Sequence, residues 1–152
     1  MPAQTFKLDP HVEQRLAARL FNRVWELLDR IERTTDDDEE MLHAAHASRH
    51  HWGQVGEPVH WARGEWQCSR VYATLGRAEP AIHHGRRCLE LAERHGLSPF
   101  DVGCAHEAIA RAAIIAGSED LGAAHAALAA QAAQAITDHE ERQVLLADLA
   151  TL

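Results

Sequence analysis

The sequence predicts an all-α protein built from stacked antiparallel helical hairpins, and three observations support this fold class. No segment alternates apolar and polar residues with a period of two, whereas every long segment shows the 3.6-residue period of a helix. Residues typical of helix ends separate these segments at short intervals. Small residues also recur at a spacing of 41 positions. A chain of 152 residues is long enough for one domain with a sizeable core.

The first three expected helices follow from their caps. The first helix starts at Asp9-Pro10, with an N-cap and a proline at the first helical position, and ends near Arg33. Asp36 and Glu39 resemble a capping box for the second helix, which runs to about residue 55. A third helix is expected over residues 58–75. The apolar stripe of the first helix consists of Val12, Leu16, Leu20, Val24, Leu27, Leu28 and Ile31.

Four further helices complete the chain. A fourth is expected over about residues 79–95 and ends at Gly96. Ser98 and Pro99 give a strong start to a fifth, which ends at Gly117. Ser118 caps a sixth helix, and Asp138 with Glu141 caps a seventh. We therefore expect a single domain over residues 1–152, with hairpins over 9–55, 58–95 and 99–136 and a capping helix over 138–151.

Charge and composition limit the classes of partner and the cellular compartment that we expect for this protein. The formal net charge is −8, which argues against nucleic acid or an anionic membrane as the main partner. Three cysteines without a C-x-x-C spacing indicate reduced thiols in a cytoplasmic protein. The first nine residues lack the apolar core of a signal peptide, and the uncharged run over 121–137 is too short and polar to span a bilayer. We expect no cofactor.

An internal repeat links the hairpins. Thr35, Gly76 and Gly117 lie 41 residues apart, each between two expected helices. The positions nine and twelve residues after them are all small, as close helix contact requires: Ala44, Gly85, Ala126, Ala47, Cys88 and Ala129.

The segment "LGRAEPA" after Tyr72, together with these small residues, resembles a tetratricopeptide repeat (TPR). The usual period is about 34 residues, and this chain resembles the longer-helix variant of bacterial regulatory proteins. HEAT-like hairpins, of similar period, are the alternative. The resemblance implies a right-handed solenoid in which the first helix of each hairpin lines a concave face and the second faces outward.

Four histidines fall in the stretch "EEMLHAAHASRHHW". Glu39, His43, His46 and His50 share one side of a helical wheel, opposite Met41 and its apolar neighbours. Zinc accepts histidines at this spacing, but an outward helix face offers no second shell of groups to orient the rings. We interpret the stripe as a solvated surface and predict no metal site.

Glu65 lies between two apolar arcs of the third expected helix. A carboxylate there is costly unless it is paired. A structural salt bridge is one interpretation, and a functional acid, base or ligand contact is the other. The candidate partners are His46, Arg49, His51 and Arg111.

The resemblance implies that three positions of each hairpin face the concave groove. In the second hairpin these are Arg63, Trp66 and Arg70. The equivalent positions are Asn22, Trp25 and Asp29 in the first hairpin and Cys104, Glu107 and Arg111 in the third. Arginine binds carboxylates and phosphates, and tryptophan supplies apolar area. The same arginines also fit an ordinary surface, where Arg111 would pair with Glu107.

These features predict a non-enzymatic binding module that recognises a peptide, a partner protein or a small anionic ligand in the concave groove. The expected binding residues are Trp25, Arg63, Glu65, Trp66, Arg70, Glu107 and Arg111. One alternative is a small enzyme or metal-dependent sensor that uses Glu65 with nearby histidines. A second alternative is a self-association module, in which the partner is another copy of the chain.

Overall fold

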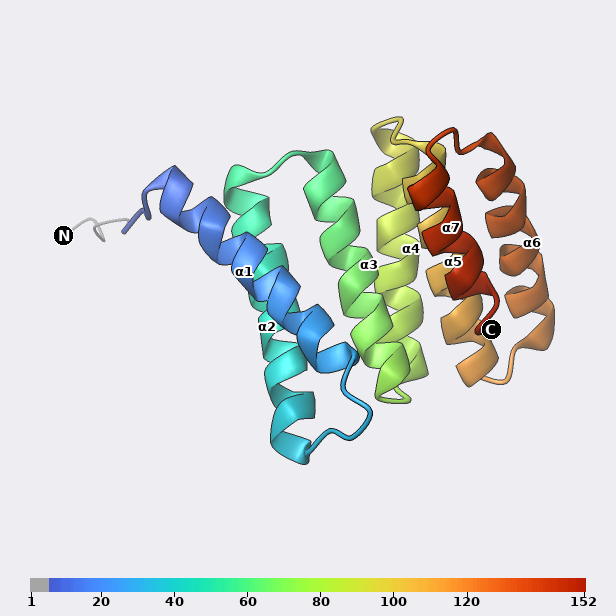
Figure 1. Ribbon diagram of the computed structural model, residues 1–152, viewed down its shortest axis with the longest axis horizontal. Helices are drawn as coiled ribbons and strands as arrows, with labels where there is room; N and C mark the ends of the chain where they lie inside the picture. Colours follow the sequence, from blue (N-terminus) through green and yellow to red (C-terminus); the bar gives the residue numbers. More distant parts are fainter. Residues whose placement is uncertain (1–5) are drawn as a thin grey trace.

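The structure, a computed structural model, describes residues 6–152, which form seven α-helices and no strand (Figure 1). Consecutive helices pack as antiparallel hairpins, and this confirms the predicted all-α class of stacked hairpins with a C-terminal capping helix. The helices are α1 (Pro10–Leu28), α2 (Thr35–Val55), α3 (Pro58–Thr74), α4 (Ala78–Arg94), α5 (Pro99–Ile115), α6 (Glu119–Ala135) and α7 (His139–Leu149).

Side-chain caps fix four helix starts. The Asp9 carboxylate accepts hydrogen bonds from two backbone amides of α1, and Asp138 does the same for the amide of Glu141 in α7. Ser98 caps α5 as predicted. The capping box of α2 consists of Thr34 and Asp37, so the predicted box of Asp36 and Glu39 was wrong by two residues.

Three glycines end helices with the same backbone geometry. Gly76, Gly96 and Gly117 have φ angles of 73°, 57° and 79°, a region that L-residues with a side chain rarely adopt. After each glycine, the next amide bonds back to a carbonyl five residues earlier at 2.9 Å, as in a Schellman motif. These turns end α3, α4 and α5.

The helix bounds match the 41-residue period only in the second and third hairpins. The bounds of α3 and α5 differ by 41 residues, and so do those of α4 and α6. The first hairpin departs from the period, because α1 ends at Leu28 rather than near Arg33 and a longer loop precedes α2. Thr35 is therefore the first residue of α2 and not a turn residue, and Ile31 is fully exposed in the loop.

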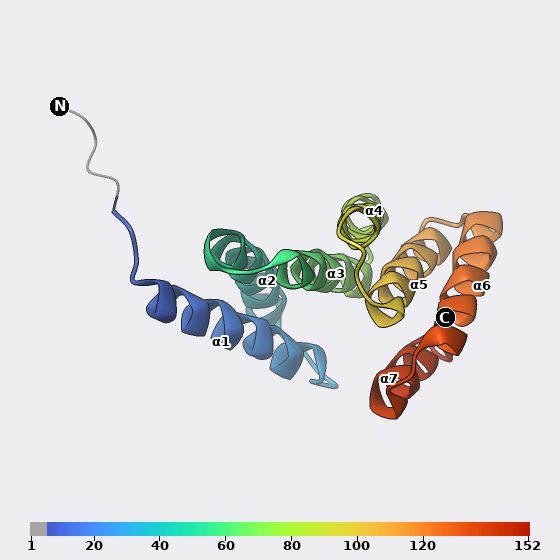
Figure 2. The same cartoon turned by 90° about the horizontal axis from the view of Figure 1, so that it is seen from above.

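The helices form a curved array in which α1 and α7 lie on the same side (Figure 2). Besides its sequence neighbours, α3 contacts both α1 and α5, and α5 contacts α7. The core runs along these contacts as clusters of small and aliphatic side chains, for example Leu27, Met41, Cys68 and Val71 between α1, α2 and α3. Within residues 6–152, no helix is long and apolar enough to cross a membrane.

Candidate functional site

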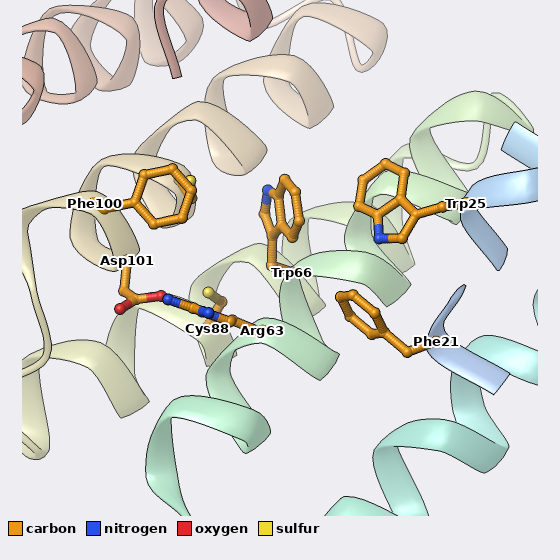
Figure 3. A pocket seen from close by; sticks show the side chains of 8 residues that line it. Phe21, Trp25, Arg63, Trp66, Cys88, Phe100 and Asp101 are labelled. Atoms are coloured by element: carbon orange, nitrogen blue, oxygen red, sulfur yellow. The ribbon is translucent and has the colours of Figure 1, made fainter. Parts of the chain in front are cut away.

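A pocket of about 260 Å³ lies between α1, α3 and α5 (Figure 3). We call it the aromatic pocket. Four of the eight Trp, Tyr and Phe residues of the chain line it. The lining residues are Phe21, Trp25, Arg63, Trp66, Cys88, Phe100, Asp101 and Cys104.

The aromatic rings contact one another across helices. The ring centroids of Trp25 and Trp66 are 5.2 Å apart, and those of Phe21 and Trp25 are 6.2 Å apart in an edge-to-face arrangement. The Gln67 side-chain amide of α3 donates to the Phe21 carbonyl at 2.9 Å, which ties α1 to α3 beside the pocket. The pocket wall is therefore held by packing and by a hydrogen bond between hairpins.

One ion pair forms the polar edge of the aromatic pocket. Arg63 Nε donates to Asp101 Oδ1 at 2.9 Å, and the same carboxylate accepts a bond from Ser98 at 2.8 Å. The Arg63 guanidinium also lies 5.7 Å from the Phe100 ring centroid, within cation–π range. Asp101 is buried, while the Arg63 side chain is 45% exposed, so the cation rather than the carboxylate is available to a ligand.

Arg70 and Arg111 lie outside the aromatic pocket. They line a second pocket of about 200 Å³ near the C-terminal residues Thr151 and Leu152. Arg111 donates to Glu107 at 2.8 Å, as the ordinary-surface interpretation anticipated. Arg70 lies 3.0 Å from an Asp148 carboxylate oxygen of α7.

Glu107 is buried between these two arginines. Burial raises the pKa of its carboxyl group above the ordinary value, although the charges of Arg70 and Arg111 oppose this. Two of the groove residues predicted in the third hairpin, Glu107 and Arg111, therefore belong to a network of opposite charges with Arg70 and Asp148.

Trp66 has a larger structural role than its groove position suggested. Its ring packs against one buried cluster that includes Ala62 and Ala105 and against another that includes Cys104 and Leu145. Trp66 therefore packs in the core between hairpins and also lines the pocket. Trp25, which comes from α1 and is absent from both of these clusters, is the better residue for testing the pocket.

Glu65 lies in a different place, between α2, α3 and α4. Its carboxylate accepts a hydrogen bond from Arg49 Nε at 3.0 Å and lies 2.6 Å from His84 Nδ1. Burial alone would raise its pKa, but His84 and Arg49 together hold the pKa of Glu65 below the ordinary value. Of the predicted partners, only Arg49 binds this carboxylate, since His51 pairs with Glu13 and Arg111 with Glu107.

The histidine stripe divides into two parts. His43 and His50 are exposed, as predicted. His46 is half-buried, with Nε2 at 2.9 Å from the Tyr72 hydroxyl, and burial lowers its pKa. The interpretation of His46 as a solvated residue was wrong, because the wheel considers α2 alone and omits its contact with α3 and α4.

The possible metal ligands are dispersed and the thiols are buried in the part of the chain that the structure describes. Among residues 6–152, no three His, Cys, Asp or Glu side chains come together as a metal ion would require. The three cysteines are buried and unpaired. Burial raises the pKa of Cys68 to about 12 and also raises the pKa values of Cys88 and Cys104, so all three are poor nucleophiles at neutral pH.

The structure adds residues that the sequence did not single out. Phe21, Phe100 and Asp101 complete the aromatic pocket, and His84 completes the Glu65 cluster. Phe21 lies one residue before the expected groove position Asn22, and Asp101 lies three residues after the predicted cap Ser98. Their pairing depends on how the hairpins stack, which no local pattern reports.

Comparison of the chain with protein-family models, with curated proteins and with solved structures found no match. The function is therefore inferred from the residues of this chain.

Proposed function

We propose that this protein is a non-enzymatic, TPR-like binding module that captures a peptide segment of a partner protein on the concave side of its helical array. The observation that supports this most directly is the aromatic pocket. Its four aromatic side chains come from α1, α3 and α5, which lie in three different hairpins. An apolar hollow of this kind fits an apolar side chain of a ligand.

The size of the pocket favours a side chain over a large ligand. Sites for drug-sized molecules occupy roughly 300–1,000 Å³, and the aromatic pocket measures about 260 Å³. Burial of one large apolar side chain contributes about 1.5–3 kcal/mol. We therefore expect a peptide with a single aromatic or large aliphatic anchor, bound weakly by this pocket alone.

The charges favour a peptide over a small anion. Each of the three predicted groove arginines has a carboxylate partner within 3.0 Å: Arg63 with Asp101, Arg70 with Asp148, and Arg111 with Glu107. A free anion would have to compete with these partners. A guanidinium has five N–H donors, and Arg63 uses Nε for Asp101, so the others can donate to a peptide carbonyl beside the anchor.

The enzyme alternative has weaker support. The Glu65 carboxylate is bound on one oxygen by Arg49 and on the other by His84. This pattern matches a structural ion pair that joins α2, α3 and α4. We propose a structural role for Glu65. The residues that we propose to bind the peptide are Phe21, Trp25, Arg63, Trp66 and Phe100.

A peptide-display selection tests the proposal. The full chain would be used to select from a random peptide library, and the binding of each selected peptide to wild type and to Trp25→Ala would then be compared. We expect the selected peptides to share one large aromatic or aliphatic residue. Trp52→Ala is the matched control, because Trp52 stacks on His60 with ring centroids 4.3 Å apart and does not line the pocket.

Two results would contradict the proposal. One is a set of peptides with no common apolar anchor. The other is equal binding of the selected peptides to wild type and Trp25→Ala. A wild-type protein that dimerises, with Trp25→Ala monomeric in the same sedimentation experiment, would instead identify a second copy as the occupant.

A further inference from the structure

Helix α7 lies against the concave surface with only one fully buried residue. That residue is Leu145, which packs with Cys104, Ala133 and Ile136. Leu149, Trp66 and Phe100 are partly buried and pack against the same cluster. Two other large apolar residues of α7, Val144 and Leu146, are 48% and 41% exposed. The helix therefore presents one narrow apolar face to the array.

The charges of α7 match those of α3 in spacing. Arg63 and Arg70 lie seven residues apart on α3, and Glu141 and Asp148 lie seven residues apart on α7. Asp148 forms an ion pair with Arg70 at 3.0 Å. Burial lowers the pKa of Arg63, but the carboxylates of Asp101 and then Glu141 raise it above the ordinary value. The charge of Glu141 therefore acts on Arg63, as that of Asp148 acts on Arg70.

Arg111 of α5 adds a further attachment at the C-terminal end of α7. Its Nη2 donates to the Asp148 carbonyl at 3.0 Å and to the Thr151 hydroxyl at 2.6 Å. Without α7, the surface of α3 and α5 that it covers would carry three arginines and only two carboxylates. The arginines are Arg63, Arg70 and Arg111, and the carboxylates are those of Asp101 and Glu107. This surface would then carry a net positive charge, although the whole chain is acidic.

One polar group beside the cluster of Leu145 has no hydrogen-bond partner among the described residues. Trp66 belongs to the cluster that Leu145 and Leu149 complete, and its Nε1 is buried with no hydrogen-bond partner among the described residues. A buried donor without a partner weakens the arrangement that contains it. This unpartnered donor therefore offsets part of the stabilisation that the apolar contacts around Trp66 provide.

We propose that α7 is a displaceable helix that occupies part of the partner-binding surface, and that the partner segment replacing it is an acidic amphipathic helix. This inference rests on the proposed binding function. The partner helix repeats the face formed by Glu141, Leu145, Asp148 and Leu149, which has the i, i+4, i+7 and i+8 spacing of one helix side. Its leucines enter the cluster beside Trp66, and its carboxylates meet Arg63 and Arg70.

The length of α7 is consistent with exchange. It has 11 residues, and isolated helices shorter than about 12–15 residues are marginal in water. Displaced α7 would thus lose its helical structure, and a partner segment of similar length would become helical only when it binds. The short connection from α6 keeps α7 at a high effective concentration, so the wild-type chain strongly resists exchange.

A labelled synthetic peptide with the sequence of residues 138–152 tests the exchange. Its binding to the full-length chain would be followed by fluorescence anisotropy. Asp148→Ala weakens the hold of the protein's own α7, so we expect this variant to bind the peptide at least about tenfold more tightly than wild type. Hydrogen exchange of the wild-type chain supplies a second measurement, and the amides of α7 should exchange faster than those of α3 and α5.

A charge reversal serves as the control. Adding Arg70→Glu to the Asp148→Ala protein should abolish binding of the natural peptide, and a peptide with Asp148→Arg should restore it. The inference is overturned if Asp148→Ala binds the peptide no better than wild type, if the reversed pair shows no restoration, or if α7 is protected as strongly as α5.

The outcome can be separated from that of the proposed function. Trp25 lines the aromatic pocket on α1 and is not part of the α7 cluster. Failure of the α7 peptide to bind, with a pocket ligand still sensitive to Trp25→Ala, would reject the displaceable helix alone. Binding of the α7 peptide, with no ligand sensitive to Trp25→Ala, would reject the aromatic pocket alone.

Discussion

The indole rings of Trp25 and Trp66 lie with their centroids 5.2 Å apart and their planes inclined by 44°, although they belong to different hairpins. They are separated by 41 residues, the same distance that relates α3 to α5. The internal repeat thus places two equivalent tryptophans side by side at the wall of one pocket. This pairing connects the repeat in the sequence to the proposed binding function.

The Glu65 cluster predicts a stability effect that depends on which group is removed. Glu65→Leu should destabilise the protein by about 3 kcal/mol, because Arg49 and His84 would lose their shared carboxylate in a partly buried site. Glu65→Gln should cost less, since the amide oxygen can still accept a hydrogen bond. Urea unfolding of both variants measures the difference, and equal stability of Glu65→Leu and wild type would contradict the structural role.

The same carboxylate predicts a loss of stability in acid. Its pKa is lower in the folded protein than the ordinary value of 4.5, so its contribution is present above pH 4.5 and disappears as the pH falls through the folded pKa. The free energy of unfolding of Glu65→Gln should therefore vary less with pH below 4.5 than that of wild type. A parallel pH dependence for the two proteins would show that Glu65 is not paired.

A second pH effect comes from the facing rings of His106 and His125, whose Nδ1 atoms lie 2.9 Å apart between α5 and α6. Burial lowers the pKa of both rings. The charge of His125 further lowers the pKa of His106, and the charge of Arg86 further lowers that of His125. Folding thus favours the neutral rings, and stability should fall as the pH drops from about 6.5 through the folded pKa values. His125→Gln should reduce this slope in thermal melts between pH 7 and pH 5, and an unchanged slope would contradict the assignment.

The glycine turns predict a backbone effect. Gly117 has a φ of 79° and open space where an added Cβ would lie, so Gly117→Ala should destabilise the protein by about 1 kcal/mol through backbone strain alone. Gly117→Asn is the matched variant and should cost less, because asparagine adopts this conformation more readily. Urea unfolding that ranks alanine above asparagine would contradict this account.

Much of the fold could be predicted because its signals are local. Asp9, Ser98 and Asp138 cap helices at the positions where the sequence placed caps, and Gly76 and Gly117 end helices as expected. The prediction of the first hairpin was less accurate, because the apolar Ile31 extends the helical period of the sequence beyond the true end of α1. A period cannot show that the chain has already left the helix.

The candidate site could be predicted only in part. The repeat placed Trp25, Arg63 and Trp66 on one face, and these three residues line the aromatic pocket. The pairs Arg63–Asp101 and Glu65–His84 join residues 38 and 19 positions apart. Such pairs depend on the stacking of hairpins, and a helical wheel describes one helix at a time.

The central claim, that the aromatic pocket binds the apolar anchor of a peptide, is tested most directly by the indole N–H signals of the four tryptophans. In ¹H–¹⁵N correlation spectra, titration with a display-selected peptide should shift the signals of Trp25 and Trp66. The signals of Trp52 and Trp61, which do not line the pocket, should stay in place. Shifts confined to Trp52 and Trp61, or no indole shift at saturating peptide, would contradict the claim.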